Sequence, residues 1–213
     1  FVASGSLYRY ERATGHIDRI SVSSEGDPSN KSVGSGTASR SGKVIAFDTS
    51  ASNMVLGDYN GVSDVFVRDV VAGKTERISI SVSGDEGNGG SRLPSISRDG
   101  RYVVFISDAS NLVIGDDNNV TDLFLHDRKT GETRLISQGL NGMPADDRSI
   151  RADLSAGANR VVFSSRASNL VGQETSGTED IYGLAVNQSV VAWQESPSEG
   201  SDESGIGLLR GWA

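Results

Sequence analysis

The sequence repeats itself with a period of 58 residues along most of its length. Phe47, Phe105 and Phe163 are the clearest markers, because each follows the previous one by 58 positions. The same offset relates three aspartates and three asparagines, namely Asp64, Asp122, Asp180, Asn53, Asn111 and Asn169. A fixed period of this size indicates an array of supersecondary units rather than one irregular domain.

The repeat that spans 91–148 shows what each unit contains. Its β-branched and aromatic runs predict four short strands, at Ser95–Ser97, Tyr102–Ile106, Asp122–Asp127 and Thr133–Ser137. Helical periodicity is absent. Four antiparallel strands form one blade of a β-propeller. We therefore expect an all-β propeller of four-stranded blades, with the three repeated phenylalanines buried between blades.

The register predicts one propeller domain over 1–213. It divides into a partial blade at 1–32, blades at 33–90 and 91–148, a degenerate blade at 149–188 and a partial blade at 189–213. So few repeats leave strand edges unpaired, which favours self-association. We expect either a partial propeller or closure by a composite blade. In that blade Val190–Gln194 and Ile206–Leu209 pair with the strands around Tyr8 and Ile20, and Phe1–Ala3 is a remnant of a second strand.

Composition excludes several classes of function. The 20 Lys and Arg against 28 Asp and Glu give a net charge of −8, which disfavours a nucleic-acid partner because phosphate binding needs a basic patch. The absence of cysteine excludes disulfides and thiol chemistry. No stretch of sequence is long and apolar enough to predict a membrane span. A first residue of Phe rather than Met indicates a trimmed product or a piece of a longer protein.

Three runs of the 91–148 repeat resemble the WD40-like repeats of TolB-type β-propellers in their long-loop bacterial form. The runs are SRDGRYVVF, SNLVIGDDNNVTDLFLHD and TGETRLIS, at Ser97–Phe105, Ser110–Asp127 and Thr130–Ser137. The resemblance implies an exported bacterial protein, periplasmic or extracellular, that acts as a binding or docking module. Some relatives are the propeller gates of serine peptidases.

Strand direction predicts which loops share a face. The turns at Asp99–Gly100 and Thr130–Gly131 are short and lie on one face of the array, whereas Ser107–Thr121 and Ile80–Leu93 are long and lie on the other. Elaborated loops on a repeat scaffold commonly bind partners. We expect this long-loop face to bind a protein or a glycan. The alternative is that the loops only pack on each other and cover the strand ends.

An acidic pattern recurs in two of the long loops, as Asp58-x-Asn60-x-x-x-Asp64 and Asp116-x-Asn118-x-x-x-Asp122. Alternating oxygen donors suit Ca²⁺, and Gly61 and Asn119 suit a tight bend. The next repeat keeps only Glu174, Ser176 and Asp180. The alternative is that these side chains close turns at strand starts through local hydrogen bonds, as we expect for the repeated Asn53, Asn111 and Asn169.

Motifs for catalysis are missing. The sequence has no Gly-x-Ser-x-Gly elbow, and no carboxylate pair stands apart from the repeat. Of its two histidines, His16 falls in a turn and His126 in a strand, where we expect a surface position.

We predict no catalytic residue and no cofactor besides Ca²⁺. The sequence favours a non-enzymatic binding module; the alternatives are the propeller domain of a larger peptidase or glycan-active hydrolase, and a structural segment of an extracellular assembly.

Overall fold

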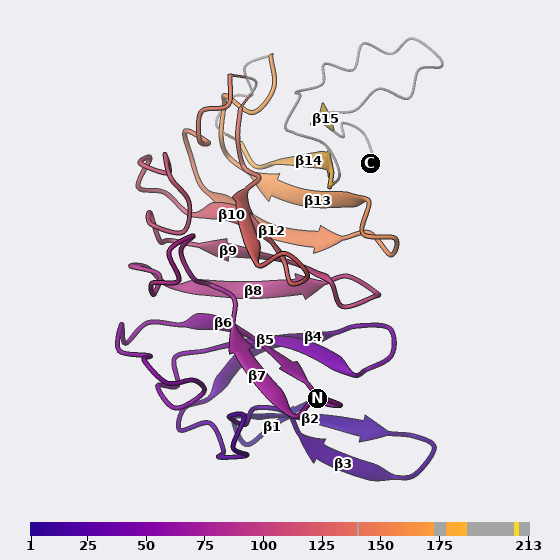
Figure 1. Cartoon of the computed structure of the whole chain (residues 1–213). Helices are drawn as coiled ribbons and strands as arrows, with labels where there is room; N and C mark the ends of the chain where they lie inside the picture. Colours follow the sequence, from indigo (N-terminus) through magenta and orange to yellow (C-terminus); the bar gives the residue numbers. More distant parts are fainter. Residues whose placement is uncertain (140, 173–177, 187–206, 209–213) are drawn as a thin grey trace.

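The computed structural model describes residues 1–139, 141–172, 178–186 and 207–208, and every element in them is a β-strand. Four antiparallel sheets lie one above another as a fan of blades (Figure 1). The first blade holds β1 (Val2–Ala3), β2 (Ser6–Glu11) and β3 (His16–Arg19). The second holds β4 (Val33–Ala38), β5 (Val44–Thr49), β6 (Asp64–Asp69) and β7 (Lys74–Arg77).

The third and fourth blades repeat this meander. The third holds β8 (Ser91–Ile96), β9 (Tyr102–Ser107), β10 (Asp122–Asp127) and β11 (Glu132–Leu135). The fourth holds β12 (Ser149–Leu154), β13 (Arg160–Ser165), β14 (Asp180–Ala185) and β15 (Gly207–Leu208). In each blade neighbouring strands are consecutive in sequence, so the all-β propeller prediction is confirmed.

The repeated aromatic positions build the centre of each blade. Each marker phenylalanine pairs across the sheet with an aromatic residue on the next strand, with ring centroids 5.8, 5.8 and 5.4 Å apart for Phe47–Phe66, Phe105–Phe124 and Phe163–Tyr182. All six side chains are buried. Residues this large contribute strongly to burial, so the 58-residue period is the period of the core.

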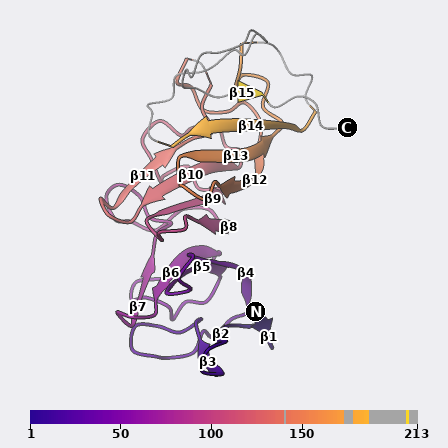
Figure 2. The ribbon, with the colours of Figure 1, turned by 90° about the vertical axis from the view of Figure 1, so that its right-hand side faces the viewer.

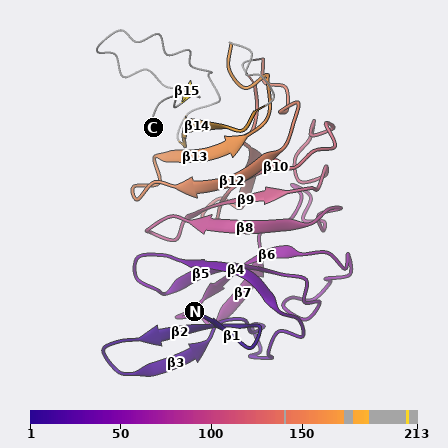
Figure 3. The ribbon, with the colours of Figure 1, turned by 180° about the vertical axis from the view of Figure 1, so that it is seen from behind.

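Consecutive blades pack face to face. Ala46 and Val65 of the second blade share a core with Val103 and Phe105 of the third, and a further core joins the third blade to the fourth. Figure 2 and Figure 3 show the same stacking from the side and from behind, with the first and fourth blades at opposite ends. The described strands therefore form an open fan.

The strand at Gly207–Leu208 corrects one expectation. It pairs with β14, through Tyr182 with Leu208 and Gly183 with Gly207, and so supplies the outer strand of the fourth blade. It does not pair with the N-terminal strands around Tyr8 and Ile20. An edge within the same blade is reached by a shorter loop than an edge at the far end of the fan, so its closure entropy is lower. Val190–Gln194 lies outside the described residues.

At the other end of the fan, β1 pairs with β2 as the expected remnant of a second strand.

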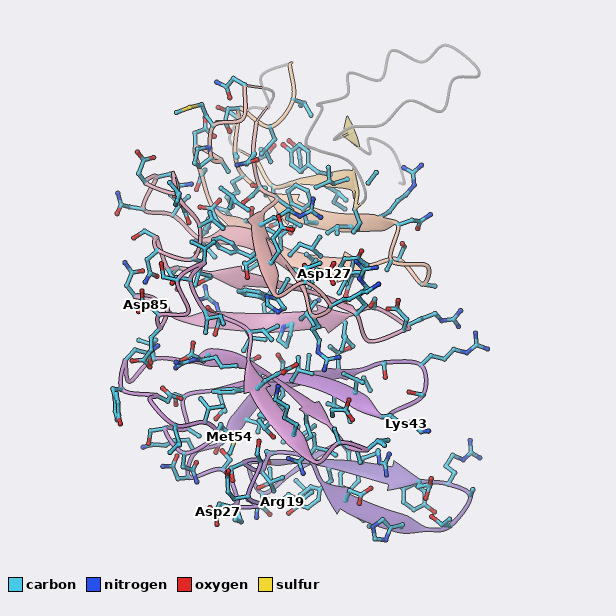
Figure 4. All side chains as sticks on the ribbon, in the orientation of Figure 1. Arg19, Asp27, Lys43, Met54, Asp85 and Asp127 are labelled. Atoms are coloured by element: carbon cyan, nitrogen blue, oxygen red, sulfur yellow. The ribbon has the colours of Figure 1, made fainter. Side chains whose placement is uncertain are left out.

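The two classes of loop separate as the strand directions predict. In Figure 4, Lys43 in the short turn between β4 and β5 lies on the opposite side from Asp85 in the connection between β7 and β8. We call the side that carries Asp85 the long-loop face. Among the described residues, no helix is long and apolar enough to cross a membrane.

Candidate functional site

The acidic residue that opens the third strand is buried in both complete repeats. Asp64 has no exposed surface, and its two carboxylate oxygens accept hydrogen bonds from Ser79 Oγ at 2.6 Å and from Asn60 Nδ2 at 3.0 Å. Ser79 Oγ in turn accepts a hydrogen bond from the backbone N–H of Val65 at 3.0 Å. Asp64 therefore joins the third strand of its blade to the end of the fourth.

Asn60 fixes the bend that precedes Asp64. Its Oδ1 accepts a hydrogen bond from Val62 N at 3.1 Å, and its Nδ2 also donates to Gly87 O at 3.1 Å. Gly61 adopts a φ of 70°, which glycine reaches without a side-chain clash. The amide orientation is set by these partners, so Asn60 orients Asp64 and ties the loop to the connection between blades.

The third blade repeats this arrangement. Asn118 Nδ2 donates to Asp122 Oδ2 at 2.6 Å and to Ala145 O at 2.8 Å, and its Oδ1 accepts from Val120 N at 3.1 Å. Asn119 takes the positive φ of 57° at the bend, as its position predicts. Ser137 Oγ donates to Asp122 Oδ1 at 2.6 Å.

The second blade contains a cation that the motif did not predict. Arg77 ends β7, and its Nη1 lies 3.5 Å from Asp58 Oδ1, 3.5 Å from Asp64 Oδ2 and 2.8 Å from Glu86 Oε1. The three carboxylates each offer an oxygen atom within 4.8 Å of one another, which is the spacing of a metal site. The guanidinium group of Arg77 lies against this cluster.

The third blade keeps the aspartates and lacks that cation. Its counterparts of Arg77 and Glu86, found by adding 58, are Leu135 and Pro144. Asp116 is 5% exposed and Asp122 fully buried. Within the described part of the chain, no Lys or Arg lies within ion-pair distance of either carboxylate, and the one polar group that contacts Asp116 is the Asp122 carboxyl.

The two carboxylate pairs differ electrostatically as a result. Burial, and then repulsion from Asp64, raise the pKa of Asp58 to about 6, while Arg77 opposes the rise. Burial, followed by repulsion from Asp122 and Asp117, raises the pKa of Asp116 to about 7. Burial also raises the pKa of Asp122, against the hydrogen bonds from Ser137 and Asn118.

Asp116 lines a cavity of about 250 Å³ on the long-loop face. The other residues that line the cavity are polar, except for one valine. They are Asn88, Asp108, Ser110, Asn118, Asn119 and Val120. Asp108 is held by Arg92 at 2.7 Å and by Thr121 at 2.6 Å, whereas Asp116 has no such partner. The fourth repeat contributes Asp180 at the start of β14; Glu174 and Ser176 lie outside the described residues.

The repeated asparagines after the second strand make structural hydrogen bonds, but these bonds are not local as predicted: they reach the connection 23 to 25 residues earlier. The Nδ2 groups donate to the carbonyl oxygens of residues 28, 86 and 144 at 2.8, 2.8 and 2.9 Å, from Asn53, Asn111 and Asn169. Their Oδ1 atoms accept hydrogen bonds from the backbone N–H two residues further along each connection. Each asparagine therefore holds one long loop to the connection that precedes its blade.

The histidines carry no catalytic arrangement in the described residues. His16 is exposed and lies 2.9 Å from Asp18. His126 was expected on the surface, which is wrong: it is 5% exposed, and its Nδ1 lies 2.9 Å from Thr133 Oγ1 on the neighbouring strand. It is buried because it lies on an inner strand, β10, which pairs with both β9 and β11, and because the second blade packs against the third.

In the part of the chain that the structure describes, five large exposed apolar residues lie in loops of the long-loop face. Leu56 and Ile114, which are equivalent in successive blades, are 101% and 93% exposed. Each precedes a glycine with positive φ, so each stands at the tip of a tight turn. Tyr59, Val82 and Met143 are exposed on neighbouring loops of the same face.

No family model and no curated protein matches the chain. Solved structures do match. A putative TolB from Agrobacterium tumefaciens is 15% identical over 87% of this chain and 53% of its own, with a TM-score of 0.54. The tricorn protease is 12% identical over 95% of this chain and 18% of its own, with a TM-score of 0.55. The chain has the fold of a TolB-like β-propeller.

A structure of prolyl endopeptidases extends the comparison. It is 16% identical over 97% of this chain and 26% of its own, with a TM-score of 0.54. The chain thus spans about half the length of the TolB structure, and 18% and 26% of the two peptidase structures. Identities this low establish the shared TolB-like fold and nothing about ligands.

Proposed function

We propose that this TolB-like propeller is a non-enzymatic, exported bacterial module that binds a partner protein through its long-loop face. The observation that carries the proposal is the set of five exposed apolar side chains on that face. Large apolar side chains in contact with water are unfavourable unless a partner covers them, and clustered ones mark protein interfaces.

The distribution of exposed apolar residues supports the choice of face. Among the described residues, Val71 is the one large exposed apolar side chain in a short turn of the opposite face. The remaining ones lie on the strands or the terminus of the first and fourth blades, at the ends of the fan. Two of the five on the long-loop face, Leu56 and Ile114, recur at the same repeat position, as expected for a surface that presents a row of equivalent contacts.

The charge around these side chains favours a protein with a basic rim. Asp85, Asp117 and Asp146 are exposed on the same loops, and the chain carries a net charge of −8. An apolar centre with an acidic border complements an apolar patch bordered by Lys and Arg, and it steers such a partner at low salt. A neutral glycan gains nothing from this border.

The proposal is tested by capture from extracellular and periplasmic extracts on three immobilised proteins. These are the wild type, the double variant Leu56→Ser with Ile114→Ser, and the control Val71→Ser on the opposite face. We expect a protein that the wild type and the control retain and the double variant loses. Its affinity should fall at least tenfold in the double variant and should weaken as salt rises.

Two results would overturn the proposal. One is binding that the double variant preserves, which would exclude the apolar tips as the contact. The other is turnover in a screen of peptide and glycan substrates by the isolated chain, which would favour the alternative of a hydrolase propeller. Retention of a glycan with no captured protein would replace the protein partner by a carbohydrate.

A further inference from the structure

The two complete repeats form an internal comparison of one position with and without a cation. In the second blade the Arg77 guanidinium lies 3.5 Å from both Asp58 and Asp64. In the third blade, which holds Asp116 and Asp122, the repeat position of Arg77 is Leu135. Because the surrounding Asn and Ser contacts are the same in both blades, the difference comes from the charged side chains Arg77 and Glu86, which Leu135 and Pro144 replace.

A second observation concerns Asp116 alone. Its side chain is about nineteen-twentieths buried, at 5% exposure, and it lines the cavity of about 250 Å³ on the long-loop face. In the described part of the chain it receives no hydrogen bond from an N–H or hydroxyl group. The polar group that contacts Asp116 is the buried Asp122 carboxyl. Two buried carboxylates side by side are unfavourable unless a cation or a proton accompanies them.

We propose that the third blade binds one Ca²⁺ ion through Asp116 and Asp122 at this cavity, and that the second blade binds none because Arg77 occupies the equivalent position. The predicted metal residues of the second blade, Asp58, Asn60 and Asp64, then form a permanent ion-pair cluster. The inference is independent of the partner-binding proposal.

The donors around the cavity match the chemistry of this ion. Ca²⁺ takes six to eight oxygen ligands with flexible geometry, and carboxylates, amide carbonyls, hydroxyls and water all serve. Asp116 lines the cavity and supplies charge together with Asp122, which contacts Asp116. Asn88 and Ser110 add neutral oxygens, and the cavity leaves room for water. Asn118 acts as a positioning residue, because its amide already donates to Asp122 and to Ala145 O. Histidine and cysteine, which softer metals prefer, are absent from the cavity lining.

A reciprocal exchange between the blades tests the proposal. Leu135→Arg gives the third blade a cation at the position where the second blade has one. Arg77→Leu removes that cation from the second blade. The control Thr130→Arg adds the same charge in an exposed turn on the opposite face. Bound calcium per chain is measured by equilibrium dialysis at pH 8, and the melting temperature is measured in millimolar calcium and in chelator.

We expect one ion for the wild type and the control, none for Leu135→Arg and two for Arg77→Leu. The melting temperature of the wild type should rise with calcium by mass action, and that of Leu135→Arg should not respond. Asp116→Asn, which keeps the shape of the side chain, should also lose the response while remaining folded. It serves as the second variant if Leu135→Arg does not fold.

Other outcomes contradict the proposal. A wild type that binds no calcium means that a proton accompanies Asp116 instead. Calcium binding that persists in both Leu135→Arg and Asp116→Asn places the ion elsewhere. An equal response to magnesium and calcium would show a diffuse acidic surface rather than a site with the geometry of Ca²⁺.

Discussion

Arg77 and Leu135 end the outer strands of two successive blades at the same repeat position, and only Arg77 places a cation against the aspartates of its blade. The Arg77 side chain is 8% exposed, so the ion pairs it makes are shielded from water. Two replacements between repeats, of Arg77 by Leu135 and of Glu86 by Pro144, thus turn a cluster that holds a cation into a buried acidic pair on the long-loop face.

Removal of Arg77 should destabilise the chain strongly when metal is absent. Arg77→Leu leaves Asp58, Asp64 and Glu86 without their counterion, and breaking a buried ion pair from one side costs about 3–5 kcal/mol. We expect a lower midpoint of chemical unfolding in chelator. Adding Asp58→Asn to the same chain should recover part of the loss. An Arg77→Leu protein as stable as the wild type would show that the guanidinium group contributes no net stability.

Truncation of the repeated aromatic core should cost as much as a large cavity. Phe105→Ala removes a ring that is fully buried and stacked on Phe124 at 5.8 Å. We expect a loss of about 3–5 kcal/mol in the free energy of unfolding. Val71→Ala, at an exposed turn, should stay within about 0.5 kcal/mol of the wild type. Equal effects of the two variants in denaturant titrations would contradict the packing described for the third blade.

The asparagines that hold the long loops should be sensitive to loss of either hydrogen bond. Asn111 accepts from Asn88 N at 2.9 Å and donates to Glu86 O at 2.8 Å. Asn111→Ala should cost about 0.5–1.5 kcal/mol, because two hydrogen bonds to partly exposed backbone groups are lost and water replaces them in part. Asn111→Asp keeps the acceptor and should cost less. Hydrogen exchange should show faster exchange at the Asn88 amide in the alanine variant than in the aspartate variant, and identical rates would refute the assignment.

Acid should weaken the fold through His126. Burial lowers the pKa of His126, an effect that Glu76 and Asp127 oppose and Arg128 reinforces. An unfolded histidine titrates near 6.5, so below that pH the unfolded chain binds a proton that the folded chain resists. The neutral imidazole of His126 therefore contributes its full stability above about pH 6.5. That contribution is lost as the pH falls from there through the lowered pKa of His126 in the folded chain.

The matched test compares His126→Gln with His16→Gln. Glutamine at 126 keeps a polar partner for Thr133 and cannot take up the proton. The drop in melting temperature between neutral and mildly acidic pH should shrink in His126→Gln and remain in His16→Gln, because His16 is exposed in the folded protein. An unchanged drop in His126→Gln would exclude this histidine as a source of acid sensitivity.

The sequence was sufficient for those features that depend on local pattern. Period, strand composition and turn residues lie within one repeat, and they predicted the blades, the buried Phe105 and the two faces. The bend at Asn119 followed from its alignment with Gly61, since both take positive φ.

Features that depend on pairing between distant segments could not be predicted in the same way. Arg77 lies on β7, opposite Phe66 in the ladder, and reaches Asp58 only because the loop between β5 and β6 folds back over the strand ends. A comparison of residues 58 apart would have shown Arg77 replaced by Leu135, but the acidic motif alone does not include that position. The burial of His126 likewise depends on both neighbouring strands.

The anomalous scattering of a crystal grown in calcium at pH 8 tests the account of Arg77 and Leu135 most directly. The account predicts one calcium peak per chain in the described blades, between Asp116 and Asp122, and none among Asp58, Asp64 and Glu86, where Arg77 remains in place. A peak beside Arg77, or an Asp116–Asp122 pair in direct contact with no ion, would contradict it.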